Sequence, residues 1–507
     1  MNRVVVIGAG HSGLVAALRL AGAGLDVTVV EHGERPGGAV ASTEATLPGF
    51  VHDTGAGFFP QTVASPAFAA LPQVLDAVDW INPAVPLAHP FLDGSAISLH
   101  RNLDATVASL DATVSGSGEP WGRLMSSLLP HAALLCGTAL NRLPPLAAGA
   151  RAALLLRRDG IELVRLMLAS GATFGRELFG AEKPAAWFAG PVIHSDLSPS
   201  AVGSGAFAFF LLFLGQAVGW PYPRGGAGRL TDALVGELAR HGGQVRCSAP
   251  ATGIVSRERR VRAVALAGGE TLPCDAVVAA ISAAPLAALL PDEALPGRLM
   301  RRLRAWRYGL GVFKFDWALA GPVPWTSEVT RRAAVVHVGD TLEALSAAAY
   351  EAGAGRVPPD PTLVLGQHTL EDPTRAPEGR HTLYGYTHLP QRLDQSDEEI
   401  TDRVERRIEA FAPGFRELVL ARACRSPRQL ERDNPSMVGG DLGGGSFELD
   451  QQLVFRPAPE LCRYRTPLRG LYLAGSSTHP GAGVHGVSGY GAAGALLADR
   501  SARRFWR

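Results

Sequence analysis

Three glycines and one acidic residue near the start of the chain form a pattern that fits the binding of a diphosphate. Gly8, Gly10 and Gly13 stand in GxGxxG spacing, and Glu31 follows them at the end of the next apolar segment. Glycines at such positions permit a tight turn, a close approach of the backbone to a pyrophosphate, and close packing of a helix on a strand. A carboxylate like Glu31 accepts hydrogen bonds from ribose hydroxyls, which predicts a dinucleotide without a ribose 2′-phosphate.

The segments around these residues have the patterns that such a site needs. Residues 4–7 form a short apolar run, which is typical of a strand buried on both faces. Apolar residues then recur three and four apart from about Ser12 to Gly22, and residues 25–31 alternate like a second strand. Together they have the length of one βαβ unit. The N-terminus of the helix would present free N–H groups and the positive end of its dipole to the phosphates.

A second glycine cluster lies near the end of the chain. Residues 471–474 predict a buried strand, Gly475 and Ser476 follow it, and a segment of small residues that predicts a helix begins near Gly486. Glycine costs conformational entropy, so a dense cluster indicates a backbone that passes close to something large. We therefore expect the two glycine-rich ends of the chain to meet around one ligand.

Four segments resemble the sequences of one superfamily. Residues 32–43 (HGERPGGAVAST) resemble the Arg-x-Gly-Gly signature that follows the dinucleotide motif in the amine oxidase and phytoene desaturase superfamily of flavoproteins. Residues 48–59 (PGFVHDTGAGFF) look like the phytoene desaturase segment that lies beside the flavin ring, and residues 220–245 and 471–499 fit the same pattern. The resemblance is greatest to the branch called pyridine nucleotide-disulphide oxidoreductase domain-containing proteins.

The resemblance implies that the ligand is FAD. It implies that Ala56 and Phe58 contact the flavin, that the backbone of Ala251 contacts adenine, and that the helix from Gly486 directs its N–H groups at the pyrimidine end of the ring. A helix N-terminus there would stabilise the negative charge of reduced flavin. Many relatives carry Asp or Glu where this chain has Ser476. The expected cofactor-binding residues are Gly8, Gly10, His11, Ser12, Gly13, Glu31, His32, Arg35, Gly37, Gly38, Ala39, Ala56, Gly57, Phe58, Ala251, Gly475, Ser476, His485, Gly486 and Val487.

The order of these segments predicts an α/β fold with two domains. A Rossmann-like FAD-binding domain, discontinuous in sequence, is expected from residues 1–70, 221–300 and 451–507. A mixed α+β substrate domain is expected to be inserted, from residues 71–220 and 301–450. A chain of 507 residues is long enough for more than one domain.

Two residues are candidates for catalysis. Lys314 stands in GLGVFKFDW (309–317), where aromatic residues share one face of a predicted strand and Lys314 and Asp316 share the other. In flavin amine oxidases a lysine on a substrate-domain strand holds a water against the flavin. Lys314 could do likewise, could accept a proton if burial lowers its pKa, or could pair with Asp316 on a solvent-facing side. His485, just before the final helix, is the other candidate acid or base, with a place in a loop wall as the alternative.

The resemblance implies FAD-dependent dehydrogenation of a lipophilic substrate, in which a hydride passes to flavin N5, a neighbouring carbon loses a proton, and a C=C bond forms. Three alternatives stay open: a flavin amine oxidase, a redox-neutral polyene isomerase, and a flavin-binding protein without catalytic activity. No motif shows metal-ligand spacing. We predict structural rather than catalytic roles for the scattered histidines His11, His194, His337, His368, His381 and His388.

Composition and charge limit the classes of partner and indicate the cellular compartment. A net charge of +1 shows no excess of positive charge of the kind that binds nucleic acid. The five cysteines lack CxxC spacing, and a strand that begins almost at Met1 leaves no room for a signal peptide, so we expect a cytoplasmic protein. The apolar stretch 205–220 is too short to span a bilayer. It predicts a buried helix, with the wall of a substrate tunnel or contact with a membrane surface as alternatives.

Overall fold

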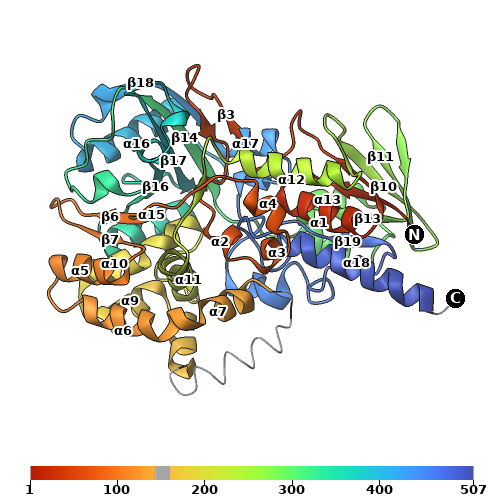
Figure 1. Ribbon diagram of the computed structural model, residues 1–507, viewed down its shortest axis with the longest axis horizontal. Coiled ribbons are helices and arrows are strands. Elements are labelled where there is room, and N and C mark those ends of the chain that lie inside the picture. The colour runs from red at the N-terminus through yellow and green to blue at the C-terminus, as the bar shows by residue number, and fades with distance from the viewer. Residues whose placement is uncertain (1, 142, 144–159, 506–507) are drawn as a thin grey trace.

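The computed structural model describes residues 2–141, 143 and 160–505, and its two largest sheets are one parallel and one mixed sheet (Figure 1). The parallel sheet has the order β19-β13-β1-β2-β9, and the mixed sheet has the order β18-β14-β17-β16-β15-β6-β7. Strands β10, β11 and β12 form a third, antiparallel sheet. The strands are β1 (Arg3–Ile7), β2 (Asp26–Val30), β3 (Ser42–Thr43), β4 (His52–Asp53), β5 (Trp80–Ile81), β6 (Leu87–Pro90), β7 (Ala96–Leu99), β8 (Tyr222–Pro223), β9 (Gln244–Arg246), β10 (Ala251–Arg257), β11 (Arg260–Leu266), β12 (Thr271–Pro273), β13 (Ala276–Ala279), β14 (Gly311–Leu319), β15 (Val335–Val338), β16 (Leu363–Gly366), β17 (His381–Leu389), β18 (Val419–Arg425) and β19 (Leu471–Leu473).

Helices cover both sheets, and the predicted α/β fold class is confirmed. Figure 1 shows the parallel sheet and the mixed sheet in two lobes, with both chain ends in the lobe of the parallel sheet. The helices are α1 (His11–Gly22), α2 (Pro60–Val63), α3 (Pro66–Ala69), α4 (Pro72–Asp76), α5 (Leu103–Thr113), α6 (Gly118–Leu128), α7 (Ala132–Ala139), α9 (Gly171–Phe179), α10 (Glu182–Ala189), α11 (Ser204–Ala217), α12 (Gly228–Arg240), α13 (Ala283–Leu289), α14 (Gly297–Arg304), α15 (Leu342–Gly353), α16 (Asp397–Phe411), α17 (Pro427–Asp433) and α18 (Val487–Phe505).

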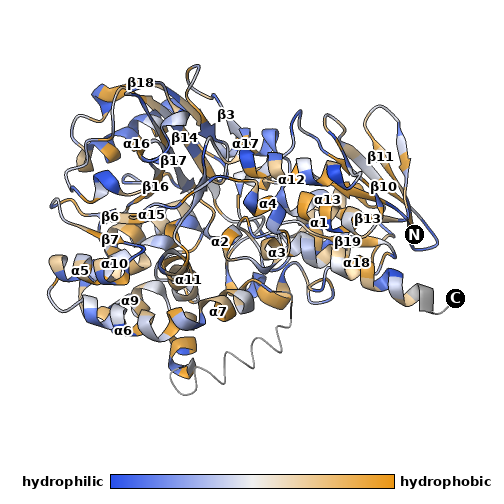
Figure 2. Ribbon diagram, in the orientation of Figure 1, coloured by the Kyte–Doolittle hydropathy of each residue, from blue (hydrophilic) through white to orange (hydrophobic). Residues whose placement is uncertain are grey.

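The parallel sheet is buried on both faces, as the apolar run of β1 predicts. Val4 and Val6 pack into one core cluster, with residues of α1, α12 and α18. Val5 and Ile7 point the other way and pack with residues of β11, α13 and α14. Alternation of side chains along a strand produces this division. The elements of both lobes carry hydrophobic residues throughout (Figure 2), and the parallel sheet and the mixed sheet each have a core on both sides.

The two ends of the chain pack on each other beside the parallel sheet. α18 lies against α1, and a Cβ added at Gly489 would come within 1.9 Å of the carbonyl oxygen of Ser12. The side-chain hydroxyls of Ser12 and Ser488 are 3.1 Å apart. Small residues in α18 thus allow two helices to approach closely, and the glycine-rich ends of the chain meet as expected.

The apolar stretch 205–220 forms most of α11, which confirms the prediction of a buried helix. No helix among residues 2–141, 143 and 160–505 combines the length and apolarity needed to cross a bilayer. Contact with a membrane surface stays a prediction, as do the domain boundaries. Part of the predicted substrate domain, residues 144–159, lies outside the described residues.

Candidate active site

A cavity of about 750 Å³ lies between the glycine-rich ends of the chain and the mixed sheet. This volume is within the range of small-molecule sites in proteins. The cavity is lined by the turns after β1 and β2, by residues 54–61, by β17 and by residues 433–437 and 441–443. It therefore joins the elements around the parallel sheet to those of the mixed sheet.

Most of the residues predicted to bind the cofactor line this cavity. They are Gly8, Gly10, His11, Ser12, Gly13, Glu31, His32, Arg35, Gly38, Ala39, Ala56, Gly57, Phe58, Ala251, Gly475 and Ser476. Four other predicted residues lie outside the lining: Gly37, His485, Gly486 and Val487. The cofactor-binding roles themselves stay predictions, but the placement shows which side chains and backbone groups face one common space.

The glycines of the first turn have three different steric roles. Gly8 has a positive φ of 98°, which favours glycine. A Cβ at Gly13 would lie 2.0 Å from the carbonyl oxygen of Gly8, so that residue allows α1 to pack on the turn. A Cβ at Gly10 would meet nothing within 4 Å. Because Gly10 lines the cavity, a side chain there would project into open space beside the N-terminus of α1.

Two neighbours hold this turn in shape. The carboxylate of Glu31 accepts hydrogen bonds from the backbone N–H of Ala9 at 2.6 Å and of Gly33 at 2.9 Å. Gly37 donates its N–H to the carbonyl of Ala9 and has a φ of 123°, and a Cβ there would lie 2.6 Å from the carbonyl oxygen of Val40. Gly37 therefore shapes the loop behind the turn, which explains why it lies outside the lining.

His485 precedes α18 with its ring turned toward the backbone. Its Nδ1 accepts a hydrogen bond from the N–H of Val487, and its Nε2 lies 3.1 Å from the carbonyl oxygen of Gly481. The ring is buried, and burial lowers its pKa to about 3. Because both nitrogens are occupied by backbone groups, this geometry argues against the predicted acid–base role and favours a helix-capping role.

Lys314 is also buried, and the prediction that its pair with Asp316 faces solvent is wrong. Both side chains are 2% exposed, and Nζ lies 2.5 Å from Asp316 Oδ1. Burial lowers the pKa of Lys314, and the carboxylate of Asp316 opposes this effect. The Nζ atom also lies 4.1 Å from the centre of the Tyr384 ring. The lysine lies outside the cavity lining, and the Tyr384 ring from the neighbouring strand β17, which does line the cavity, lies against its Nζ.

We expect Lys314→Met to lower the free energy of unfolding by about 3 kcal/mol, because it removes the nearest cation from the buried Asp316 carboxylate and leaves only the more distant His52 and Arg425. The double variant Lys314→Met/Asp316→Leu should recover most of this loss, since it removes both charges. Urea titration of both variants measures the difference. Normal stability of Lys314→Met together with a large loss of substrate-driven flavin reduction would instead restore the catalytic assignment.

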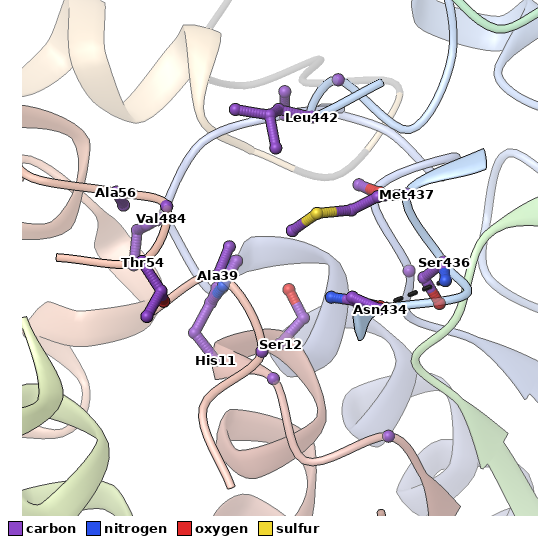
Figure 3. A pocket seen from close by; sticks show the side chains of 18 of the residues that line it. His11, Ser12, Ala39, Thr54, Ala56, Asn434, Ser436, Met437, Leu442 and Val484 are labelled. Carbon is purple, nitrogen blue, oxygen red and sulfur yellow. Dashed lines mark hydrogen bonds between the residues drawn. The ribbon is translucent and has the colours of Figure 1, made fainter. Parts of the chain in front are cut away.

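The sequence did not indicate the wall opposite the glycine turn. Residues 434–437 follow α17, and in Figure 3 the side chains of Met437 and Leu442 face His11, Ser12 and Ala39 across the hollow. The N–H of Ser436 donates to Asn434 Oδ1, which closes the loop locally. A Pro and an Asn beside each other predict only a turn. The position of this turn over the cavity is set by the packing of α17 against β14.

The segment 441–447 also contributes to the lining, through Asp441, Leu442, Gly443 and Phe447. The carboxylate of Asp441 accepts hydrogen bonds from the N–H groups of Gly309, Gly443 and Gly445. Buried Arg456 donates to the carbonyl oxygens of Gly443 and Ser476, and so ties this segment to the turn after β19.

A buried network of charges links β4 to the segment 372–375 next to the cavity. Asp53 in β4 accepts hydrogen bonds from Arg375 at 2.7 Å, from the N–H of Ala227 and from Ser42 Oγ. Arg375 also pairs with Asp372 at 2.9 Å and donates to the carbonyl of Pro223. All of the charges in this network are inaccessible to solvent. The network holds the segment 54–57 in place beside the cavity.

Histidine and tyrosine side chains form the cavity wall on the side of the mixed sheet. His194, Tyr384, Tyr386 and His388 all line the cavity, although the sequence predicted structural roles for the two histidines. Tyr384 donates its hydroxyl to the carbonyl of Gly55. Within the described part of the chain, no group of His, Cys, Asp and Glu side chains is arranged to hold a metal ion.

The residues present fit an FAD molecule. The open position beside Gly10 and the N-terminus of α1 would receive the diphosphate, and Glu31 faces the same space at the end of β2. The cavity extends from there to Ala251 in one direction and to Ala56, Phe58 and Gly475 in the other. A long dinucleotide needs such an extended and partly glycine-lined space.

Comparison with known proteins agrees with this geometry. Residues 11–497 match the family described as "Flavin containing amine oxidoreductase". The chain is 30% identical to pyridine nucleotide-disulfide oxidoreductase domain-containing protein 2 of Rattus norvegicus, over 98% of this chain and 93% of the relative. It is 28% identical to hydroxyneurosporene desaturase of Rhodobacter capsulatus, over 98% of each chain.

The solved structures with similar folds include putrescine oxidase bound to putrescine, with a TM-score of 0.61, 17% identity and 99% of each chain covered. An oxidoreductase from Methanosarcina mazei has a TM-score of 0.60 at 16% identity, over 98% of this chain and 100% of that one. At such low identity these matches show a shared fold. The sequence matches, in contrast, cover nearly the whole chain and confirm the resemblance to the carotenoid desaturases and their relatives. The chain therefore belongs to the flavin-containing amine oxidoreductase family and is a FAD-dependent oxidoreductase.

Proposed function

We propose that the protein dehydrogenates a lipophilic substrate and converts a carbon–carbon single bond to a double bond. The observation that carries this proposal is the apolar wall of the cavity beyond the flavin segments. It includes Phe207 and Leu211 of α11 together with Met437, Leu442 and Phe447. Walls of this kind suit a substrate with few polar groups. The names of two relatives, hydroxyneurosporene desaturase and phytoene dehydrogenase, support the same reaction class.

The position of Lys314 weighs against the alternative of an amine oxidase. A lysine that holds a water against the flavin would have to reach the cavity, whereas Lys314 pairs with Asp316 behind Tyr384. Four carboxylates line the cavity: Glu31 at the glycine turn, Asp433 at the end of α17, and Asp196 and Asp441. The last two are both hydrogen-bonded to backbone groups. Asp441 accepts from three N–H groups, and Asp196 accepts from the N–H of Phe447. These carboxylates hold loops together and are poorly placed to bind an ammonium group.

When bound, FAD supplies the group that accepts a hydride from the substrate. The chain's own residues have three tasks in this reaction: they orient the substrate C–H bond, exclude water, and take up the proton that leaves the neighbouring carbon. The apolar wall provides the first two. Tyr386 and His194 are polar groups on the cavity wall that lies on the side of the mixed sheet, and we propose that they take up the proton.

An anaerobic test of flavin bleaching decides between the candidate functions. The purified FAD protein is mixed with a pool of partly saturated lipophilic polyenes and, separately, with a pool of amines, and the flavin absorbance is followed. We expect bleaching by the polyene pool. Bleaching by amines alone would overturn the proposal in favour of an amine oxidase. A flavin that dithionite reduces readily, but that neither pool bleaches, would favour a binding function without catalysis.

A further inference from the structure

Asn434 is the first residue after α17, and its turn faces the glycine turns of the other lobe across the cavity. α17 packs against β14 and β18 of the mixed sheet, so this turn belongs to the lobe of that sheet. A Cβ at Gly38 would lie 3.5 Å from the Cα atom of Gly10 and 3.7 Å from Nδ2 of Asn434. Gly10, Gly38 and Asn434 therefore lie close together, and all three line the cavity.

Three of the four polar groups of Asn434 are used within its own turn. Its backbone N–H donates to the carbonyl of Leu430 at 2.9 Å, and its backbone carbonyl accepts from the N–H of Met437 at 2.8 Å. Its side-chain Oδ1 accepts from the N–H of Ser436 at 3.1 Å. An amide nitrogen cannot accept a hydrogen bond, so this last contact fixes the orientation of the side-chain amide and directs Nδ2 away from the turn.

The fourth group is the NH₂ of the side chain. Within the part of the chain that the structure describes, this group has no hydrogen-bond acceptor. In Figure 3 it points from the loop toward Ser12, at the start of α1. The Asn434 side chain is half-buried in the cavity wall. Its NH₂ group is therefore available as a donor to an oxygen atom of a ligand that fills the cavity.

We propose that Asn434 donates its side-chain N–H to the diphosphate of FAD, and that the cofactor thereby joins the two lobes. The diphosphate is the part of FAD that fits beside Gly10 at the N-terminus of α1, and the Asn434 amide approaches the same place from the opposite lobe. Phosphate oxygens accept hydrogen bonds from neutral amides as well as from cations. This inference concerns the cofactor and does not depend on the reaction proposed above.

The competing role for Asn434 is confined to its turn. Asn is favoured in turns because its side chain accepts a hydrogen bond from the backbone N–H two residues further on, and Asp serves equally well. The two roles thus use different ends of the same amide. A change from Asn to Asp separates them, because it keeps the oxygen that the turn needs and removes the donor that the cofactor needs.

Two variants and one control test the contact. Asn434→Asp keeps the acceptor for Ser436 and places a negative charge toward the diphosphate. Asn434→Ser is neutral, keeps a side-chain acceptor for the turn, and is too short to replace the amide. Asn102→Asp is the matched control, because Asn102 accepts from the N–H of Ala105 at the start of α5 and lies outside the cavity lining.

The first readout is the rate at which the FAD-loaded protein releases its cofactor on dilution, followed by flavin fluorescence. Loss of one hydrogen bond to a charged group weakens binding about ten- to a hundredfold. We expect release to be about tenfold faster in Asn434→Ser and about a hundredfold faster in Asn434→Asp, where charge repulsion adds to the lost bond. Asn102→Asp should release FAD at the wild-type rate.

Two results of this measurement would overturn the proposal. Wild-type release from Asn434→Asp would show that Asn434 only shapes its turn. Faster release from Asn434→Asp together with wild-type release from Asn434→Ser would show that the introduced charge, and not the lost donor, causes the effect.

The second readout locates the contact on the cofactor. In ³¹P NMR of the FAD-saturated proteins, we expect Asn434→Ser to shift at least one diphosphate signal and Asn102→Asp to shift neither. The visible absorbance band of the flavin should keep its wild-type shape, because the proposed contact is to the diphosphate and not to the ring. Unchanged ³¹P signals in Asn434→Ser would overturn the assignment to the diphosphate, whatever the release rate.

The third readout tests the link between the lobes. The N–H groups of Ser436 and Met437 are bonded to Asn434, so their hydrogen exchange reports on this loop. We expect saturating FAD to slow exchange in residues 434–437 of the wild type and of Asn102→Asp, and to slow it much less in Asn434→Ser. Equal slowing in all three proteins would show that the cofactor does not hold the loop through this side chain.

Discussion

Gly10→Val is expected to yield a folded protein that purifies without flavin. Gly10 has a φ of −68°, which valine can adopt, and a Cβ there meets no other atom within 4 Å. The new side chain would point into the cavity at the N-terminus of α1, where the diphosphate is proposed to lie. Filling a packed site costs about 1–3 kcal/mol or more, so FAD should bind at least about tenfold more weakly.

The neighbouring glycine provides a contrast. Gly13→Ala would drive a methyl group to 2.0 Å from the carbonyl oxygen of Gly8 and should lower both the stability and the flavin content. Gly10→Val should lower only the flavin content. The flavin absorbance per protein and the thermal midpoint of the apoprotein separate the two effects. A Gly10→Val protein that keeps its full flavin content would place the diphosphate elsewhere.

Arg375→Met is expected to lower the free energy of unfolding by about 3–5 kcal/mol, because it leaves two buried carboxylates without their shared partner. Asp53 and Asp372 both contact this guanidinium, and neither is accessible to solvent. The triple variant Asp53→Asn/Asp372→Asn/Arg375→Met should recover part of the loss, since it removes all three charges. Urea titration measures both changes. A loss below about 1 kcal/mol in Arg375→Met would show that the network contributes little.

The ion pair between Asp53 and Arg375 also predicts how the stability of the protein depends on pH. Burial alone would raise the pKa of Asp53, but Arg375, His368 and the N–H of Ala227 hold it below its ordinary value. A carboxyl whose pKa is lowered by folding contributes stability above its unfolded pKa of about 3.9 and loses it as the pH falls. Without Arg375, the effect of burial dominates and the pKa of Asp53 rises above its unfolded value. The Asp53 carboxylate then lowers the stability at neutral pH, and this loss is relieved as the pH falls. The stability gap between wild type and Arg375→Met should therefore narrow from pH 7 to about pH 4, and a constant gap would contradict this account.

Local sequence patterns were sufficient to predict the elements whose backbone conformation depends on residues close by in the chain. The GxGxxG turn, the helix that follows it and the final small-residue helix could be predicted because glycine spacing and apolar periodicity act within a few residues. The positive φ of Gly8 and the close contact at Gly13 are requirements that few other residues could meet. The family resemblance then extended the prediction to residues that face the cavity, such as Ala251 and Gly475.

The tertiary structure decided which polar side chains are buried and which of them meet. The alternation of side chains along β14 correctly placed Lys314 on the opposite face from its aromatic neighbours. Both faces of that strand are covered, however, so the ion pair of Lys314 and Asp316 lies in the interior. His194 and His337 are far apart in sequence, and they meet because the 3-10 helix Gly190–His194 packs against β15. The spacing of residues along the chain does not indicate such long-range packing. The cofactor could therefore be predicted from the sequence, whereas the wall that faces it could not.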